Sequence, residues 1–275
     1  MRAIEAGFDA IERVEQALSL YREDSDLSRL NREGVIKAPH PDLVTVLQHA
    51  AHTSQLTQGA FDVTVQPLWR LFSMARSDRR MPSEEEVTLA RTSVDWTAVE
   101  IDPSQVRLRK PGMAITLNGI AQGFAVDRVM QVLRAHGIEH ALVDTGEFGA
   151  IDGNSNSQPW SVGIQHPRDA VALASRIALK NRCLATSGDY ATSFSTDRRH
   201  HHIFDPHTGY SPSEIASASV LAATAIQADA LSTALLVLGL ERGMELIEGI
   251  ADVDAFLIDK QGRTFASSNF PSPLS

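Results

Sequence analysis

Hydrophobic spacing in the first part of the chain predicts three helices. Apolar residues that share one helical face run through residues 3–20: Ile4, Phe8, Ile11, Val14 and Leu18. A short helical turn is expected around Leu27 and Leu30, within a polar segment. The third helix is predicted from Pro41, a residue suited to a first helical turn, to Leu56.

Strand-like patterns begin after these helices. Residues 60–72 start like a strand, which Pro67 interrupts. Residues 98–102 and 106–110 are rich in strand-forming residues, and the turn at Pro103 predicts that they form a hairpin.

The second half of the chain mixes strands and helices without strict alternation. Residues 113–146 read as a strand, a glycine-containing turn, a long helix and a strand. Further elements are expected as strands at 160–164, 175–179 and 182–186, helices at 225–238 and 240–249, and a strand pair at 253–265. This order predicts an α+β protein with mixed sheets packed against helices. We expect one domain over residues 1–275, with a disordered tail from about residue 267.

Composition and charge exclude some classes of partner. The 275 residues suffice to bury a sizeable core, and 43% of them are hydrophobic. The formal net charge is -9 and there is no basic block, so nucleic acid is not an expected partner. The single cysteine, Cys183, excludes an intrachain disulfide and is expected in the core.

One predicted helix suggests metal binding. Asp229 lies in the apolar segment 225–238, where an ionised carboxylate is costly to bury without a partner. Thr233 follows four residues later and therefore shares its helical face. One charged and one neutral oxygen suit a hard cation that also bridges to phosphates. A helix cap or a carboxylate at the core edge is the simpler explanation, and the helix alone favours it.

Two other segments suggest contacts with a phosphate-bearing ligand. Gly119 and Gly123 lie at the predicted start of a helix, where backbone N–H groups attract phosphate. Their spacing is not GxGxxG, and a tight turn that permits helix packing explains them equally well. Asp62 and Thr64 share a face beside Phe61, although a satisfied loop carboxylate and a core phenylalanine are the simpler explanation.

Three consecutive histidines, His200 to His202, offer acid–base chemistry. Consecutive strand residues alternate faces, so all three cannot easily bind one ion. His202 precedes the turn-forming segment 203–209, which makes it a reasonable candidate for proton transfer. Ser187, His202 and Asp205 could form a hydrolase triad, but the chain lacks the GxSxG turn of such enzymes.

Seven segments together resemble one family, the FAD:protein FMN transferases or ApbE-like flavin transferases. They occur in that family's order and spacing between about residues 10 and 258: SLYREDSDLSRLN, GAFDVTVQPL, NGIAQGFAVDR, LVDTGEFGAIDG, ATSGDY, HHIFDPHTG and ADALSTALLVLG. The resemblance implies an α+β fold and Mg²⁺-dependent transfer of FMN from FAD to a Thr or Ser hydroxyl of a target protein, with release of AMP. The implied target carries a Thr/Ser flavinylation motif and is expected to be a membrane-associated redox subunit.

The resemblance also implies roles for individual residues. The metal would be held by the backbone carbonyl of Gly119 and the side chains of Asp229 and Thr233, with Ser232 close by. Tyr21 would lie against the flavin. Further positions are implied to contact FAD: Ala60, Phe61, Asp62, Thr116, Gln122 and Ile203. His202 corresponds to the histidine that is expected to deprotonate the acceptor hydroxyl. Because phosphoryl transfer depends on positioning and charge neutralisation, a cation beside these residues makes chemical sense.

The chain departs from the family pattern in two places. Many relatives carry Lys or Glu where Gln122 stands, so a charged cofactor contact is not expected there. Relatives also carry a strand and a Met-Gly-Thr-like segment before the first helix, so the first strand of the fold is expected to be missing. The family is mostly periplasmic or membrane-anchored. No signal peptide is recognisable before the first helix, which leaves a cytoplasmic location open.

Two alternatives use the same residues. If water replaced the acceptor hydroxyl, the protein would be a Mg²⁺-dependent FAD pyrophosphatase that releases FMN and AMP. If Gln122 or the missing strand disabled turnover, it would be a non-catalytic flavin-binding protein. Tyr21 favours the transferase, because an aromatic ring there seats the flavin and restricts water.

Overall fold

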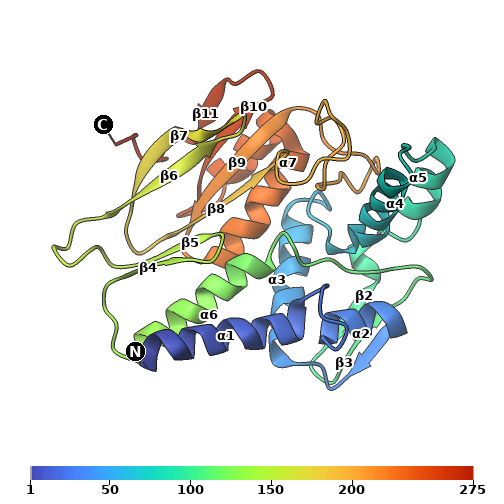
Figure 1. Ribbon diagram of the computed structural model, residues 1–275, viewed down its shortest axis with the longest axis horizontal. Coiled ribbons are helices and arrows are strands. Elements are labelled where there is room, and N and C mark those ends of the chain that lie inside the picture. Colours follow the sequence, from blue (N-terminus) through green and yellow to red (C-terminus); the bar gives the residue numbers. More distant parts are fainter. Residues whose placement is uncertain (1, 275) are drawn as a thin grey trace. The chain divides into compact units, whose positions relative to one another are not determined.

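Stretches that are distant in the sequence come together in two units of the computed structural model, which describes residues 2–274 (Figure 1). The sheet unit is formed by Met1–Glu12, Ile120–Tyr190 and Ser213–Ser275. The helical unit is formed by Arg13–Gly119 and Ala191–Pro212. The expected mixture of helices and sheets is confirmed.

The sheet unit is built on a six-stranded antiparallel sheet in the order β11-β10-β9-β8-β5-β4. Its elements are β4 (Ala141–Asp144), β5 (Phe148–Ile151), β6 (Trp160–His166), β7 (Asp169–Leu179), β8 (Cys183–Gly188), β9 (Ile215–Ala222), β10 (Asp254–Asp259), β11 (Thr264–Ala266), α6 (Ala121–Ala135) and α7 (Ala225–Glu248). Every residue of the central strand β9 is buried. The sequence pattern did not predict β9, β5 or the short β1.

The two faces of this sheet are covered by different elements. Residues of the β6–β7 hairpin, Val162 and Ile177 among them, pack against Leu184 and Leu221 of the sheet. On the other face, α6 packs through Val126 and neighbouring residues against β4, β5 and the buried Cys183. Because strand residues alternate between faces, β8 presents Cys183 and Ser187 to the helices and Leu184 to the hairpin.

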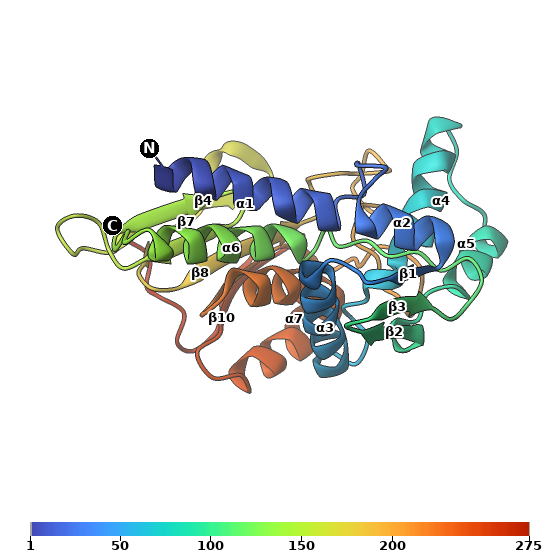
Figure 2. The ribbon, with the colours of Figure 1, turned by 90° about the horizontal axis from the view of Figure 1, so that it is seen from below.

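Helix α1 (Arg2–Leu18) confirms the first predicted helix, and Val14 and Leu18 of its predicted apolar face are buried. Ile11 packs with α6, beside which the first turns of α1 run (Figure 2). Ile4 and Phe8, expected on the buried face, are 63% and 68% exposed. At that end of the helix the contact with α6 is made by the small residue Gly7, which lies against Val129.

The helical unit contains a small antiparallel sheet in the order β1-β3-β2 and several short helices. Its elements are α2 (Asp26–Glu33), β1 (Val35–Lys37), α3 (Pro41–Leu56), the 3₁₀ helix η1 (Val63–Val65), α4 (Gln66–Ser77), α5 (Glu84–Arg91), the 3₁₀ helix η2 (Trp96–Ala98), β2 (Val99–Asp102) and β3 (Gln105–Leu108). The hairpin predicted around Pro103 is confirmed as β2 and β3. Phe72 lies at the centre of an aromatic core with Phe194 and Phe204.

Two predicted strands are absent from the described chain. Residues 60–72 form η1 and α4, because Asp62 caps η1 by accepting from Thr64 N–H and Pro67 fits the first turn of α4. Residues 113–117 run without a strand ladder. The Asn31 side chain replaces a neighbouring strand there, donating to the Ile115 carbonyl at 2.8 Å and accepting from its N–H at 2.6 Å.

The two helices predicted over 225–249 are confirmed as one long element with a break. Gly239 has φ 77° inside α7, in the left-handed region that favours glycine. A Cβ there would also overlap the carboxylate of Glu214. The break therefore falls where the sequence placed the boundary between two helices.

Part of the tail expected to be disordered is packed on the sheet unit. Ser267 is buried, and the Phe270 ring stacks on Phe256 with 5.5 Å between ring centroids. Over residues 2–274, none of the helices combines the length and the apolar character needed to cross a membrane.

Replacing Gly123 with alanine should destabilise the protein by about 1–3 kcal/mol through overpacking. A Cβ on this α6 residue would overlap the Ala225 carbonyl oxygen and lie 2.8 Å from Asp229 Cβ, both on α7. Gly7→Ala is the matched control, because its Cβ would meet only Val129 at 3.7 Å. Chemical denaturation should show Gly7→Ala unchanged or up to about 1 kcal/mol more stable. Equal effects of the two substitutions would contradict the close α6–α7 contact.

Candidate active site

The carboxylate of Asp229 is the central group of the sheet unit's site. Asp229 is 3% exposed and points from α7 toward the start of α6, where Gly123 N–H donates to its Oδ2 at 2.9 Å. Among the described residues, no basic side chain forms an ion pair with Asp229, and Gly123 is its one hydrogen-bond donor. Burial therefore raises the pKa of this carboxyl well above its ordinary value.

Helix α6 also fixes the first turn of α7. Asp127 lies one helical turn after Gly123, and its two carboxylate oxygens accept from Ala225 N–H at 2.9 Å and Ile226 N–H at 3.0 Å. These N–H groups have no intrahelical partner at a helix start, so Asp127 serves as a cap supplied by a neighbouring helix. The position of Asp229 along α7 is thus set by two contacts with one face of α6.

Three hydroxyl groups gather one turn further along α7. Ser187, from β8, lies 2.8 Å from Ser232 Oγ and 2.9 Å from Thr233 Oγ1. Ser232 is fully buried and donates to the backbone carbonyl of Asp229 at 2.8 Å. The predicted trio of Asp229, Ser232 and Thr233 is therefore together on α7, and β8 adds a hydroxyl that the sequence pattern did not select for this site.

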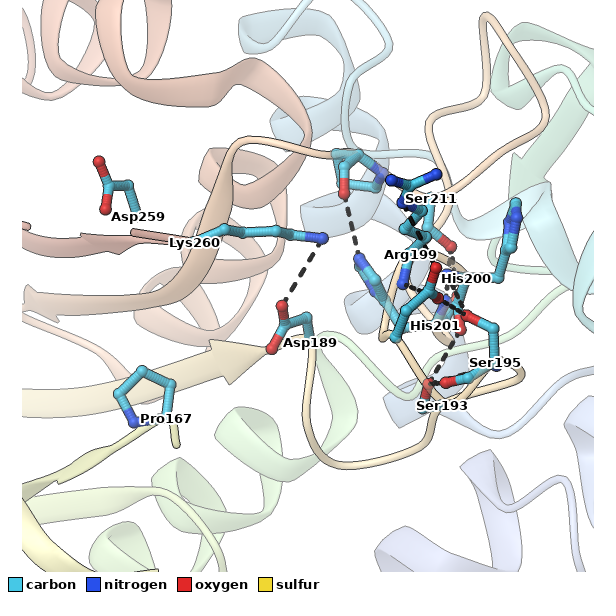
Figure 3. Close-up of polar contacts among 12 residues, drawn as sticks. Pro167, Asp189, Ser193, Ser195, Arg199, His200, His201, Ser211, Asp259 and Lys260 are labelled. Carbon is cyan, nitrogen blue, oxygen red and sulfur yellow. Dashed lines mark hydrogen bonds and ion pairs between the residues drawn. The ribbon is translucent and has the colours of Figure 1, made fainter. Parts of the chain in front are cut away.

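The end of β8 is held by buried charge. Asp189 is fully buried and accepts from both terminal nitrogens of Arg168 at 2.6 and 2.8 Å. Lys260 approaches the same carboxylate at 3.6 Å (Figure 3). This ion pair lies two residues beyond Ser187 and restrains the strand that carries it.

A second carboxylate, Glu147, lies near Asp229. Glu147 is 7% exposed, precedes β5, and accepts from Thr186 N–H at 3.0 Å. Burial, followed by the negative charge of Asp229, raises the pKa of Glu147. Sequence reasoning missed this residue; its signal was a lone acidic side chain directly before the apolar stretch Phe148–Ile151.

This set of groups suits a hard cation. A buried carboxylate without a basic partner carries a charge that a bound cation would neutralise, and hydroxyls can complete its coordination. Among the described residues there is no cluster of three or more His, Cys, Asp or Glu side chains that could hold an ion by itself. A cation held beside Asp229 would therefore need hydroxyl, water or phosphate oxygens as further ligands.

His202, the predicted base, lies in the helical unit. Its backbone N–H and its ring Nδ1 both lie within hydrogen-bonding distance of the Thr192 carbonyl, at 3.0 and 3.2 Å. A carbonyl oxygen only accepts, so neutral His202 carries its proton on Nδ1 and its lone pair on Nε2. That tautomer is the one a general base working through Nε2 requires.

The other two histidines are structural. His201 is fully buried; its N–H donates to Ser211 Oγ at 2.8 Å and its carbonyl accepts from the same hydroxyl at 2.7 Å (Figure 3). His200 packs near Phe72 and Tyr210. The expectation that the three rings would not converge on one ion agrees with these different surroundings.

Tyr21 borders a cavity of about 740 Å³ within the helical unit. The ring is 81% exposed, so a planar ligand can reach it. Lining side chains include Asn31, Gln66, Trp69, Arg70 and Asn118. The combination of two aromatic rings with amide and guanidinium donors suits a flat heterocycle with carbonyl groups.

The remaining predicted contacts are distributed between the units. Ala60, Phe61 and Asp62 are buried in the helical unit, which also holds Thr116, Gly119 and Ile203. The Asp62 carboxylate is engaged with Thr64 and Trp96 N–H groups, and burial raises its pKa to about 6.

Gln122 belongs to the first turn of α6 in the sheet unit. Its Nε2 lies 2.7 Å from where a Cβ on Gly146 would stand, so a glycine at 146 gives this side chain room. The roles assigned to Gln122 and to the residues of the helical unit stay predictions.

Comparison with known proteins identifies the class to which this protein belongs. The ApbE family model matches residues 2–257, and the chain belongs to that family. The FAD:protein FMN transferase of Vibrio cholerae is 34% identical over 277 residues, which cover 96% of this chain and 82% of that protein. The FAD:protein FMN transferase of Escherichia coli K12 is 32% identical over 284 residues, which cover 94% of this chain and 78% of that protein.

Solved structures show the same fold. The ApbE protein of Thermotoga maritima superposes with a TM-score of 0.90 at 29% identity, covering 98% of this chain and 90% of that one. The flavin transferase ApbE of Vibrio cholerae gives a TM-score of 0.86 at 32% identity, covering 98% and 89%. The predicted ApbE-like fold is confirmed.

The paired carboxyls predict a pH-dependent stability of the metal-free protein. Both pKa values are raised on folding, so their protonated forms stabilise the fold below pH 4, and this contribution is lost as pH rises through the raised values. Glu147→Gln should remove part of the loss. From pH 6 to pH 9 in EDTA, the free energy of unfolding should decrease less for Glu147→Gln than for the unmodified protein. The two decreases should differ by at least about 1.4 kcal/mol, the free energy that corresponds to one pKa unit.

Urea unfolding at a series of pH values measures this difference. Glu241→Gln, at an exposed position on α7, is the control and should follow the unmodified protein. Parallel curves for all three proteins would contradict the raised pKa of Glu147.

Proposed function

We propose that the protein is a Mg²⁺-dependent FAD:protein FMN transferase. It would transfer the FMN portion of FAD to a Thr or Ser hydroxyl of a target protein and release AMP. Membership of the ApbE family and the names of the relatives from Vibrio cholerae and Escherichia coli support the transfer of flavin to protein. The Thr/Ser acceptor, the metal and the second product are our proposal.

The observation that carries the metal assignment is the buried carboxylate of Asp229 without a basic partner. We assign its Oδ1 as the cation-binding oxygen, because Oδ2 accepts from Gly123 N–H. Thr233 would supply a second oxygen from one turn further along α7. When bound, Mg²⁺ would neutralise negative charge on the pyrophosphate of FAD.

The chain's own residues would carry out the proton transfer. The acceptor hydroxyl attacks the FMN phosphorus, the phosphoanhydride bond breaks, and AMP leaves with the bridging oxygen. His202 Nε2 takes the hydroxyl proton, and the Thr192 carbonyl holds the ring through Nδ1–H. A neutral imidazole whose proton is on Nδ1 has a lone pair on Nε2 and can accept a proton there.

Tyr21 supports transfer over hydrolysis. Its exposed ring at the border of the cavity can stack on the isoalloxazine, which is worth about 0.5–1.5 kcal/mol. A seated flavin leaves less space for water near the phosphorus. We further propose, from the family resemblance, that the acceptor is a membrane-associated redox subunit and that the enzyme works in the periplasm or at the membrane.

A direct test incubates the protein with FAD, Mg²⁺ and an acceptor carrying a Thr flavinylation motif. We expect a flavinylated acceptor by mass spectrometry and AMP in equal amount. Free FMN with an unmodified acceptor would instead identify a pyrophosphatase, and no reaction would identify a flavin-binding protein. Asp229→Ala should abolish transfer at every Mg²⁺ concentration; full activity of that variant at low millimolar Mg²⁺ would contradict the metal assignment.

Replacing His202 with alanine should leave FAD affinity nearly unchanged and slow transfer by about 10²-fold or more, the usual contribution of a general base. His207→Ala, at an exposed position in the same segment, serves as the control and should transfer at the normal rate. Single-turnover flavinylation at saturating FAD measures the step. Equal rates for both variants would show that another group accepts the proton.

A further inference from the structure

The hydroxyls of Thr233, Ser187 and Ser232 and the backbone carbonyl of Asp229 form a connected hydroxyl chain. Ser187 Oγ lies 2.9 Å from Thr233 Oγ1 and 2.8 Å from Ser232 Oγ, and Ser232 Oγ lies 2.8 Å from the Asp229 carbonyl oxygen. The chain links β8 with α7 inside the sheet unit. All three distances are ordinary for hydrogen bonds between oxygen atoms.

The direction of every bond in this chain follows from its last acceptor. The Asp229 carbonyl oxygen can only accept, so Ser232 must donate its single hydroxyl proton to this oxygen. Between Ser187 and Ser232 the donor is then Ser187. Since Ser187 has no second proton, the bond with Thr233 has Thr233 as its donor.

This direction fixes the hydroxyl of Thr233 in the orientation that a metal ligand needs. A hydroxyl group binds a cation through an oxygen lone pair, and its proton must point away from the positive charge. With its proton directed at Ser187, Thr233 keeps its lone pairs for other partners. Thr233 is only half-buried, so those lone pairs can face a ligand, whereas Ser232 is fully buried.

We propose that Ser187 is a positioning residue of the metal site, which accepts the Thr233 proton and so presents the Thr233 lone pair to the cation. Ser232 then acts as the next member of the hydroxyl chain and not as a direct ligand. This inference rests on the proposed Mg²⁺ function. Groups that orient metal ligands through hydrogen bonds typically change metal affinity by about 10- to 100-fold when they are removed.

The opposite face of the same sheet offers a matched control. Thr186 Oγ1 and Ser219 Oγ, on β8 and β9, lie 2.8 Å apart. Strand residues alternate faces, so this pair lies on the side covered by the β6–β7 hairpin, away from α7. Ser219 is fully buried, and Ser219→Ala removes a buried sheet hydroxyl without touching the hydroxyl chain.

The test is the affinity of the full-length protein for Mg²⁺, measured by titration calorimetry in the presence of ADP as a pyrophosphate that carries no FMN. Ser187→Ala should weaken Mg²⁺ binding by about 10-fold or more. Ser219→Ala should stay within twofold of the unmodified protein.

A double-mutant cycle separates positioning from a general loss of structure. In a Thr233→Val background the Ser187 acceptor has nothing to orient, so Ser187→Ala should have no further effect on Mg²⁺ affinity. An undiminished effect in that background, an unchanged affinity in Ser187→Ala, or an equal loss in Ser219→Ala would each overturn the proposal.

Ser232→Ala provides a second route if Ser187→Ala does not fold. Without Ser232, the Ser187 proton is free to turn toward Thr233, so Mg²⁺ affinity should also fall. Normal affinity in this variant would contradict the directed hydroxyl chain. If the unmodified protein bound no Mg²⁺ at all, the proposed metal function would fail together with this inference, whereas Mg²⁺ binding that is insensitive to both substitutions would overturn the inference alone.

Discussion

The structure of the sheet unit depends on a carboxylate buried without a basic partner. Leaving Asp229 ionised inside α7 is unfavourable unless a cation or several donors compensate it. The fold supplies one donor, Gly123 N–H, and brings α6 so close that position 123 has no room for a side chain. Asp127 fixes the same helix start from one turn away. Two helices are thus arranged around a charge that neither neutralises.

A buried site of this kind suits a positively charged ligand, which would offset the cost of burying the carboxylate. The neighbouring Glu147 is a second buried acidic group, and burial together with their mutual repulsion disfavours the ionised forms of both carboxyls. In the proposed metal site, Thr233 would provide a neutral oxygen ligand and Ser187 the acceptor that orients it. This arrangement is suited to a cation that arrives with a phosphate-bearing substrate and does not stay permanently bound.

The sequence allowed the helix with Asp229 and Thr233 to be predicted, because the segment is long and almost continuously apolar and Gly239 marks the break. Ser187 was considered only as a nucleophile, since its role depends on which strand lies beside α7. Glu147 gave only a weak local signal, because its partner Asp229 is distant in the sequence. Contacts between segments that are far apart in sequence cannot be derived from local spacing.

The wrong secondary-structure predictions have a similar cause. Residues 113–117 have strand composition, but the Asn31 side chain supplies the pairing that a neighbouring strand would otherwise give. Residues 60–72 are short and apolar, and a capping contact from Asp62 decides in favour of helices. The apolar face predicted for α1 is buried at Val14 and Leu18 but exposed at Ile4 and Phe8, where Gly7 makes the contact with α6.

The central claim is that Asp229 binds a divalent cation through Oδ1, with Thr233 beside it. Crystals soaked in Mn²⁺, which scatters anomalously and takes the same oxygen ligands, test this directly. The account predicts an anomalous peak at metal–ligand distance, about 2.0–2.3 Å, from Asp229 Oδ1 and Thr233 Oγ1, with the Gly123 N–H bond to Oδ2 retained. A peak bound to Oδ2 in place of that bond, or no peak at Asp229 in crystals that bind Mn²⁺ elsewhere, would contradict it.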